Sequence, residues 1–282
     1  MDTSETMDDP TPILPDLRPD SGPSRAHKRS FATARVIMAL MLREMTTKYG
    51  RSPGGYIWAI LEPAGAIALL SFGFSLMMRT PSLGSSFIVF YASGYMVFNH
   101  YNTLEKAINN ALPYAAGLLR YPVVTWLDAI LARFFINTLT NILNAIVIIW
   151  GALYFSGSSM MVDFWPIVEA MTAASVLALG MGTVDAFLLG ISPIYRSIYK
   201  IITRPLMILS AVLYIVDDLP STVRDIIWYN PLVHITGLMR SGIYATYDPQ
   251  YISLSYVFTI AMVSLTFGLV LLRGYARTIV HD

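Results

Sequence analysis

Long blocks of apolar residues run along most of this chain and replace the alternating stripes that soluble amphipathic helices show. A hydrocarbon core about 30 Å thick is crossed by roughly 20 apolar residues in an α-helix. Blocks of this length predict an all-α integral membrane protein with six transmembrane helices inside a membrane domain at residues 56–276. The expected bounds of the helices are residues 56–78, 87–103, 123–155, 164–190, 198–216 and 251–272.

The segment before the first block has the periodicity of an amphipathic helix. Apolar residues recur at spacings of three and four at Phe31, Ala34, Met38, Met41 and Met45. Arg35 and Arg43 fall to one side of this stripe. A helix of this length and polarity suits the membrane interface, although packing against a soluble partner is an alternative. We predict an N-terminal amphipathic interfacial helix within residues 30–55, followed by a hinge made by glycine and proline.

The segment between the fifth and sixth blocks, residues 217–249, is too long for a turn. Its two short apolar pieces are separated by Asn230-Pro231, and neither is long enough to cross a membrane. Two further full spans are disfavoured because Asp225 and Arg240 lie within the segment. We therefore predict a re-entrant helix pair that enters the outer leaflet and returns.

The distribution of basic residues predicts the orientation of the chain. Lysine and arginine are concentrated in the segments that share a side with the N-terminus, whereas the opposite segments carry only Arg79, Arg224 and Arg240. By the positive-inside rule, both termini are expected in the cytoplasm. Residues 1–29, rich in proline and acids, predict a disordered cytoplasmic tail, and residues 277–282 a cytoplasmic C-terminus.

Composition excludes several classes of function. Without cysteine the chain has no disulfides or thiolate ligands, and its four scattered histidines lack the spacing of metal ligands. None of its four lysines ends a glycine-rich phosphate-binding loop, so we expect no ATPase activity, no metal and no cofactor in this chain. The net charge of +1 gives no indication of a nucleic-acid partner.

Ionisable residues inside the expected spans are costly and usually face protein or water. Five of them are expected at similar depth near the cytoplasmic boundary: Glu62, Asp128, Arg133, Asp185 and Arg204. We predict that they form an ion-pair network at the cytoplasmic entrance of a route through the protein. An assembly clamp between helices is the alternative.

Six motifs carry a family resemblance. They are residues 42–63, which end in Leu61-Glu62-Pro63, and the shorter Leu118-Leu119-Arg120-Tyr121-Pro122, Leu131-Ala132-Arg133, Arg204-Pro205-Leu206, Asp218-Leu219-Pro220 and Trp228-Tyr229-Asn230-Pro231-Leu232. On these motifs, residues 30–276 resemble type-2 ABC transporter permeases of the polysaccharide exporter family, most of all the inner-membrane permeases for capsular polysaccharide. The motifs separate capsule export less well from O-antigen or teichoic acid export.

The resemblance implies a homodimer that works with two separate ATP-binding subunits, which would bind ATP and Mg. It also implies a periplasmic adaptor, an outer-membrane pore and a lipid-linked polysaccharide as substrate. The interfacial helix and a short helix within residues 104–118 would contact the ATPase. Four residues there are the expected coupling residues: Asn109, Asn110, Pro113 and Tyr114.

Two sets of residues are candidates for the substrate path. Tyr91, Tyr95 and Phe98 share one face of the second span, and Tyr56 begins the first; their rings could stack on sugars, with interface anchoring or helix packing as the alternative. An anionic lipid-linker end would be attracted to basic residues at the inner surface, whose alternative role is topology alone. These are Arg43, Lys48, Arg51 and Arg120.

The function expected from these observations is export of lipid-linked capsular polysaccharide across the bacterial inner membrane, driven by ATP hydrolysis in a partner. Two alternatives stay open: an exporter of drugs or small lipids with the same permease type, and an intramembrane enzyme that modifies glycolipids. The enzyme would need a concentrated acid/base or metal cluster at the bilayer surface, whereas the acids in this sequence are scattered.

Overall fold

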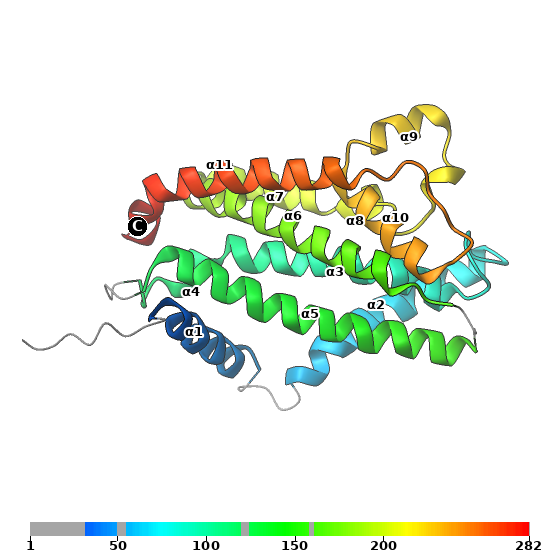
Figure 1. Cartoon of the computed structure of the whole chain (residues 1–282), viewed down its shortest axis with the longest axis horizontal. Helices are drawn as coiled ribbons and strands as arrows, with labels where there is room; N and C mark the ends of the chain where they lie inside the picture. The colour runs from blue at the N-terminus through cyan, green and yellow to red at the C-terminus, as the bar shows by residue number, and fades with distance from the viewer. Residues whose placement is uncertain (1–31, 50–54, 120–123, 158–160, 282) are drawn as a thin grey trace, which may run out of the picture. The chain divides into compact units, whose positions relative to one another are not determined.

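The computed structural model describes residues 32–49, 55–119, 124–157 and 161–281, and within these ranges all regular structure is helical (Figure 1). The all-α prediction is therefore confirmed for this part of the chain. The predicted tail at residues 1–29 and most of the predicted hinge lie outside the described residues. Apart from Ala32, all described residues belong to one compact unit, Thr33–Asp282.

Four helices are long and apolar enough to cross a membrane among the described residues: α2 (Gly55–Met77), α5 (Trp126–Ser156), α6 (Phe164–Ile191) and α11 (Leu254–His281). They match the first, third, fourth and sixth predicted spans, and α11 continues beyond its predicted end. Side-chain caps define two of the helix starts. Thr125 and Asp128 form a capping box at the start of α5, and the Asp163 side chain accepts a hydrogen bond from the Trp165 N–H.

The second predicted span is longer than the sequence indicated. α3 (Phe87–Asn109) continues past residue 103, where we expected a loop with a short helix, and is followed by the short α4 (Ala111–Ala115). That boundary was wrong because Leu104 and Ile108, both completely buried, continue the apolar face of the helix. The polar residues between them made this turn look like a loop in the sequence.

The prediction of one continuous fifth helix over residues 198–216 was also wrong. The helical path starts earlier, at α7 (Pro193–Thr203), and ends at α8 (Leu206–Leu209). It starts early because the Ser192 side chain caps α7, and it is interrupted because Pro205 has no N–H to donate. The path turns at Ala211, whose φ of 55° lies in the left-handed region.

The segment before α11 contains the 3-10 turn η1 (Val216–Asp218), α9 (Ser221–Ile227) and α10 (Pro231–Ile243). The predicted break at Asn230-Pro231 is confirmed, since the Asn230 side chain accepts a hydrogen bond from the Leu232 N–H at 3.0 Å. α10 is largely buried against α6 and α3, whereas α9 has no buried residue.

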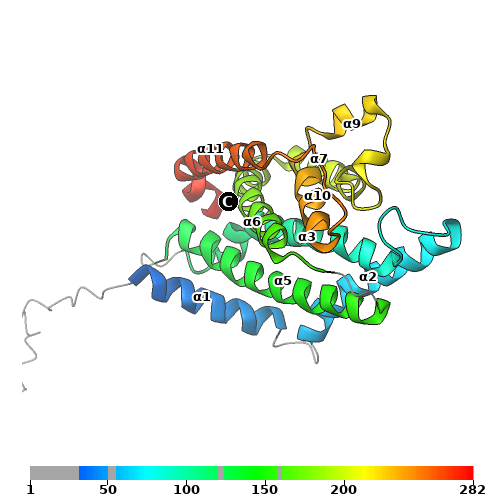
Figure 2. The ribbon, with the colours of Figure 1, turned by 45° about the vertical axis from the view of Figure 1, so that its right-hand side comes forward.

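The centre of the unit is α6, which packs most extensively on α11 and α3 (Figure 2). Close approach depends on small residues: a Cβ at Gly180 would lie 2.4 Å from the Ala261 carbonyl oxygen, and one at Gly182 would lie 2.8 Å from Ile108 Cβ. Such close approach at small residues is typical of helices that pack within membranes.

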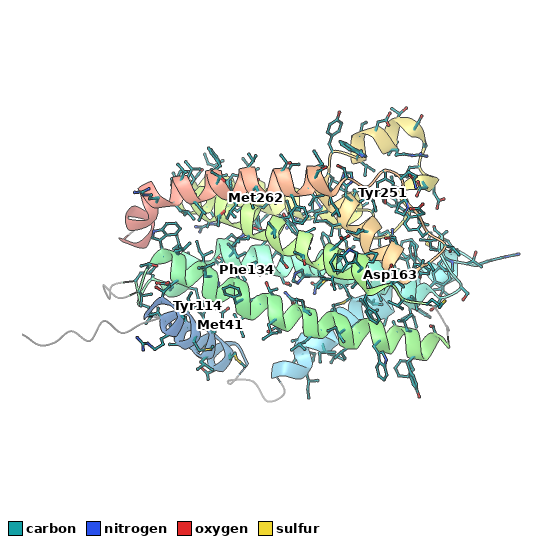
Figure 3. All side chains as sticks on the ribbon, in the orientation of Figure 1. Met41, Tyr114, Phe134, Asp163, Tyr251 and Met262 are labelled. Atoms are coloured by element: carbon teal, nitrogen blue, oxygen red, sulfur yellow. The ribbon has the colours of Figure 1, made fainter. Side chains whose placement is uncertain are left out.

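The two ends of the helical unit carry different elements. Helices α1 (Ala32–Tyr49) and α4 lie at one end, called here the α1 end, and α9 and α10 lie at the other, the α10 end (Figure 1). Met41 and Tyr114 accordingly lie close to the α1 end, and Asp163 and Tyr251 lie close to the α10 end (Figure 3). The helix predicted within residues 30–55 is present as α1.

Candidate functional site

A buried ion pair joins α1 to α5 at the α1 end. The Glu44 carboxylate, 4% exposed, lies 3.2 Å from Nε of Arg133. Arg133 also donates from Nη1 to the carbonyl of Ala107 in α3 at 2.9 Å, and Asn137 donates to Glu44 at 3.4 Å. One guanidinium on α5 therefore holds both α1 and the last turn of α3.

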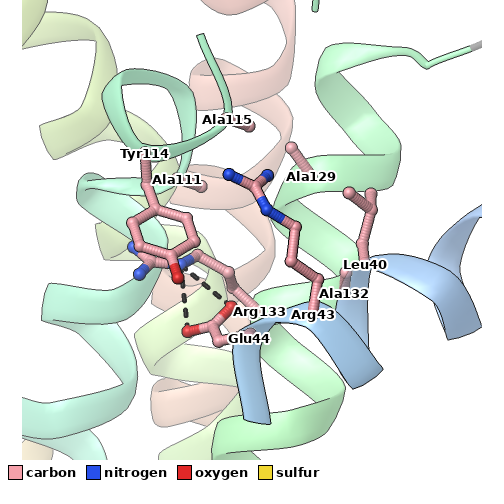
Figure 4. A pocket seen from close by; sticks show the side chains of 9 residues that line it. All are labelled: Leu40, Arg43, Glu44, Ala111, Tyr114, Ala115, Ala129, Ala132 and Arg133. Carbon is pink, nitrogen blue, oxygen red and sulfur yellow. Dashed lines mark hydrogen bonds and ion pairs between the residues drawn. The ribbon is translucent and has the colours of Figure 1, made fainter. Parts of the chain in front are cut away.

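The ring of Tyr114 in α4 packs on the same junction (Figure 4). The Arg133 guanidinium lies 4.0 Å from the ring centroid and the Arg43 guanidinium lies 5.7 Å from it, both within cation–π range. The Tyr114 hydroxyl and the Thr47 hydroxyl share a hydrogen bond at 2.5 Å. The cavity left between these groups is about 10 Å³, too small for anything beyond a single water. The junction is therefore built to hold α1, α4 and α5 together and not to bind a ligand.

The outer side of α3 and α4 forms an exposed ridge at this end. Its exposed members are Lys106, Asn110, Pro113, Tyr114 and Gly117. Three of the four predicted coupling residues lie on this ridge. Asn109 does not: it is 3% exposed and donates to the Glu105 carboxylate at 2.8 Å. The prediction that Asn109 docks on a partner was wrong because its side chain points into the bundle.

Comparison with known protein families identifies the family of the chain that carries this junction and ridge. The profile of the ABC-2 type transporter family matches residues 35–244, more than half of the chain. The chain belongs to the ABC-2 type transporter family. This membership confirms the resemblance that the sequence motifs indicated.

Relatives extend this similarity over nearly the whole chain. The polysialic acid transport protein KpsM of Escherichia coli is 28% identical over 242 residues, which cover 84% of this chain and 92% of KpsM. The capsule polysaccharide export inner-membrane protein CtrC of Neisseria meningitidis serogroup B is 28% identical over 260 residues, 89% of this chain and 97% of CtrC. The corresponding protein BexB of Haemophilus influenzae is 24% identical over 265 residues, 92% of this chain and 98% of BexB.

The five charges predicted as one network do not form it in this ABC-2 type protein. Among the residues that the structure describes, Arg133 pairs with Glu44 and not with an acid of the predicted set. Asp128 accepts hydrogen bonds from the N–H and the hydroxyl of Thr125, at 2.9 and 2.7 Å, within its own helix start. Asp185 accepts from the Tyr195 hydroxyl at 2.5 Å, while Glu62 and Arg204 are exposed. Similar depth was a poor guide because the side chains point in different directions around their helices.

The predicted aromatic path is also corrected by the packing. Tyr91 and Phe98 are 2% and 7% exposed, and the Tyr91 ring lies 5.2 Å from the rings of Phe74 and Phe90. Both residues belong to the core, so neither is open to a passing polymer. Tyr95 is half-buried, and Arg43 is exposed beside α4. The side chains of Lys48 and Tyr56, and the whole of Arg51 and Arg120, lie outside the described residues.

Sequence reasoning missed the role of Arg240 in α10. Its guanidinium is 1% exposed and donates to the carbonyls of Ala211, Val212 and Tyr214 at 2.8, 2.7 and 2.6 Å. It also lies 4.4 Å from the centroid of the Phe90 ring. Arg240 thus holds the chain where the α7–α8 path turns. A lone arginine within a mainly apolar helix was the available signal.

An open pocket of about 590 Å³ lies at the α10 end, within the size range of small-molecule sites. Its lining includes Asp217, Asp218, Asp248, Arg224 and Tyr247. The Tyr247 hydroxyl donates to Asp217 at 3.1 Å. Three carboxylates against one guanidinium make this pocket unfavourable for an anionic group.

Proposed function

We propose that this chain is the permease subunit of an ATP-driven exporter that moves lipid-linked capsular polysaccharide across the bacterial inner membrane. The observation that carries the proposal is the extent of the similarity. Relatives named for capsule polysaccharide export align over 97–98% of their own length. The similarity therefore extends over nearly the full length of these relatives and is not confined to a shared segment.

The energy source in this proposal is a separate ATP-binding subunit. The sequence has no phosphate-binding loop ending in Gly-Lys-Ser or Gly-Lys-Thr, so ATP and Mg would be bound by the partner. We infer two such subunits on a homodimer of this chain. Their contact surface would be the exposed ridge of α3 and α4, because Arg133, Glu44 and Tyr114 fix this ridge to α1 and α5.

The proposed topology has six spans, a re-entrant pair within residues 217–249, and both termini in the cytoplasm. α1 would lie in the inner interface, where lipid would cover its apolar side chains. Met38 and Leu42 support this placement, since they are 56% and 57% exposed while the polar Glu44 is buried. The α1 end would then be cytoplasmic and the α10 end periplasmic.

The substrate route would be a water-filled path between two permease copies, since a long polar chain cannot cross an apolar slab without desolvating its hydroxyls. Arg43, Lys48, Arg51 and Arg120 would attract the anionic lipid-linker end at about 1 kcal/mol each, as basic residues near anionic lipid do. Tyr56 and Tyr95 are the aromatic candidates that remain. A periplasmic adaptor and an outer-membrane pore would receive the polymer.

The proposal is tested by deleting the gene and analysing the polymer. We expect surface polysaccharide to disappear and a lipid-linked polymer to accumulate inside the cell, and chemical analysis of that polymer separates capsule from O-antigen or teichoic acid. Accumulation of a drug or a small lipid, with normal surface polysaccharide, would contradict the proposal.

The ATPase contact is tested by isolating the permease in detergent with any bound ATP-binding chain. Pro113→Asp places a charge on the exposed ridge and should abolish co-isolation. Val223→Asp, at a 40% exposed position of α9 on the opposite end, is the matched control and should leave it unchanged. Equal retention of the partner by both variants would remove the ridge from the interface.

A further inference from the structure

Two buried acids meet behind the exposed ridge, where α3, α6 and α7 come together. Glu105 and Asp185 are 3% and 6% exposed, and each of their carboxyl groups accepts a hydrogen bond from a tyrosine of α7. Buried carboxyl groups depend on hydrogen-bond donors supplied by the protein.

Two tyrosines of α7 donate to these acids. The Tyr199 hydroxyl donates to Glu105 at 2.6 Å, and the Tyr195 hydroxyl donates to Asp185 at 2.5 Å. The amide of Asn109 donates to the other Glu105 oxygen at 2.8 Å and to the Tyr199 hydroxyl at 3.1 Å. These five residues are called the acid–tyrosine clasp: Glu105, Asn109, Asp185, Tyr195 and Tyr199.

The clasp is important for α7 because that helix has little else to hold it. None of its residues, Pro193–Thr203, is buried, and Ile194 and Ile201 are 73% and 68% exposed. Apolar packing within this chain therefore holds α7 weakly. The directed contacts of α7 with α3 and α6 include the two phenol hydrogen bonds to buried carboxyl groups, the bond from Asn109 to Tyr199, and a bond from Arg196 to the Leu189 carbonyl at 3.3 Å.

The clasp also lies directly behind the exposed ridge of α3 and α4. Glu105 and Asn109 are buried, whereas their neighbours Lys106 and Asn110 are exposed on the ridge. A force applied to the ridge thus acts on the same helical turn that binds α7. From α7 the chain continues through α8 to the carbonyls that Arg240 holds.

We propose that the clasp transmits movement of the α3–α4 ridge to α7, with Glu105, Asp185, Tyr195 and Tyr199 acting as positioning residues in the transport cycle. This inference rests on the proposed function, because it assigns the ridge to the ATP-binding partner. The two phenols and the amide of Asn109 supply the hydrogen bonds that hold the clasp together.

The functional test uses the complex of permease and ATP-binding subunit in lipid nanodiscs, with polysaccharide export measured in cells. Tyr199→Phe and Glu105→Ala should leave co-isolation of the partner unchanged. The ATP hydrolysed per polysaccharide chain exported should rise about fivefold or more, as expected for the loss of a coupling interaction. Tyr154→Phe, at a 71% exposed position, is the matched control and should change nothing.

A conservative variant separates positioning from structure. Glu105→Gln keeps a side-chain oxygen that can accept the hydrogen bond from Tyr199, so it should restore the normal ratio of hydrolysis to export. If Glu105→Gln is as uncoupled as Glu105→Ala, or if Tyr199→Phe matches the Tyr154→Phe control, the clasp has no coupling role.

A distance measurement tests the clasp without the partner. The chain has no cysteine, so Lys106→Cys and Ser197→Cys can carry spin labels on the ridge and on α7, with labelled chain diluted in unlabelled chain. We expect one narrow distance distribution, broadened by Tyr199→Phe. A distribution that Tyr199→Phe leaves unchanged overturns the inference. Failure of the unmodified chain to co-isolate any ATP-binding subunit instead overturns the proposed function.

Discussion

Asn144 on α5 donates a hydrogen bond from its side-chain amide to the backbone carbonyl of Ala59 on α2, at 3.0 Å. Four residues after Ala59 is Pro63, inside the same helix. Proline has no N–H, so the Ala59 carbonyl has lost the donor that an α-helix would normally supply. Asn144 supplies that donor from a neighbouring helix.

This relationship predicts that the two sites are energetically coupled. Asn144→Leu should lower the free energy of unfolding by about 1–2 kcal/mol, because it leaves a partly buried carbonyl unpaired. In a Pro63→Ala background the helix provides its own donor, so the same substitution should cost about 0.5–1.5 kcal/mol less. Denaturation of the purified protein in detergent measures both values. An equal cost in the two backgrounds would show that Asn144 does not replace the missing donor.

Gly94 is expected to be intolerant of a side chain. A Cβ there would lie 3.0 Å from Nη2 of Arg240 and 3.1 Å from the Val212 carbonyl oxygen. Gly94→Ala should therefore destabilise the protein by about 1–3 kcal/mol, the usual cost of overpacking. At Gly73 nothing lies within 4 Å of the added atom, so Gly73→Ala should be neutral or stabilise by up to about 1 kcal/mol. Thermal unfolding of the two variants tests the contrast, and similar melting temperatures would contradict it.

Exchanging the two charges of the Glu44–Arg133 pair should lower the stability of the protein. Glu44→Ala leaves a guanidinium that is 14% exposed without its carboxylate and should cost about 1–3 kcal/mol. The double variant Glu44→Arg, Arg133→Glu should not restore stability. A carboxylate at position 133 would face the Tyr114 ring and the Ala107 carbonyl, both of which favour a cation. Unfolding in detergent measures this cycle, and full recovery in the exchanged variant would exclude the environment described.

Asp128 is expected to act in the capping box at the start of α5 and not as a member of a charge network. Asp128→Ala should cost about 1 kcal/mol, as for other lost caps. Its effect should add to that of Arg204→Gln, since the two side chains have no shared contact in the described part of the chain. The free energies of unfolding of the two single variants and the double variant provide the test. A deviation from additivity of about 1 kcal/mol would show that Asp128 and Arg204 interact, as the predicted charge network requires.

Much of the architecture was predictable from the sequence because it depends on local chemistry. The apolar blocks of α2, α5 and α6 are long enough to identify membrane helices with nearly correct bounds. Asn230-Pro231 broke the chain where expected, since the asparagine caps the helix that the proline begins. The motifs also indicated the ABC-2 type family, and with it a transport function, before any contact was known.

The contacts at the two ends were decided by tertiary structure alone. Helical periodicity shows which residues share a face, but it does not show which element that face will meet. Glu44, which lies outside the predicted spans, forms an ion pair with Arg133. The side chain of Asn109 points into the bundle and donates to Glu105, although its sequence neighbourhood is typical of an exposed loop. In the sequence, Arg240 contributes only to the count of basic residues that predicts orientation. The structure shows that it donates to backbone carbonyls at the turn around Ala211. A buried polar group needs a hydrogen-bond partner that is close in space. How far apart two residues are in the sequence does not show whether they are close in the folded chain.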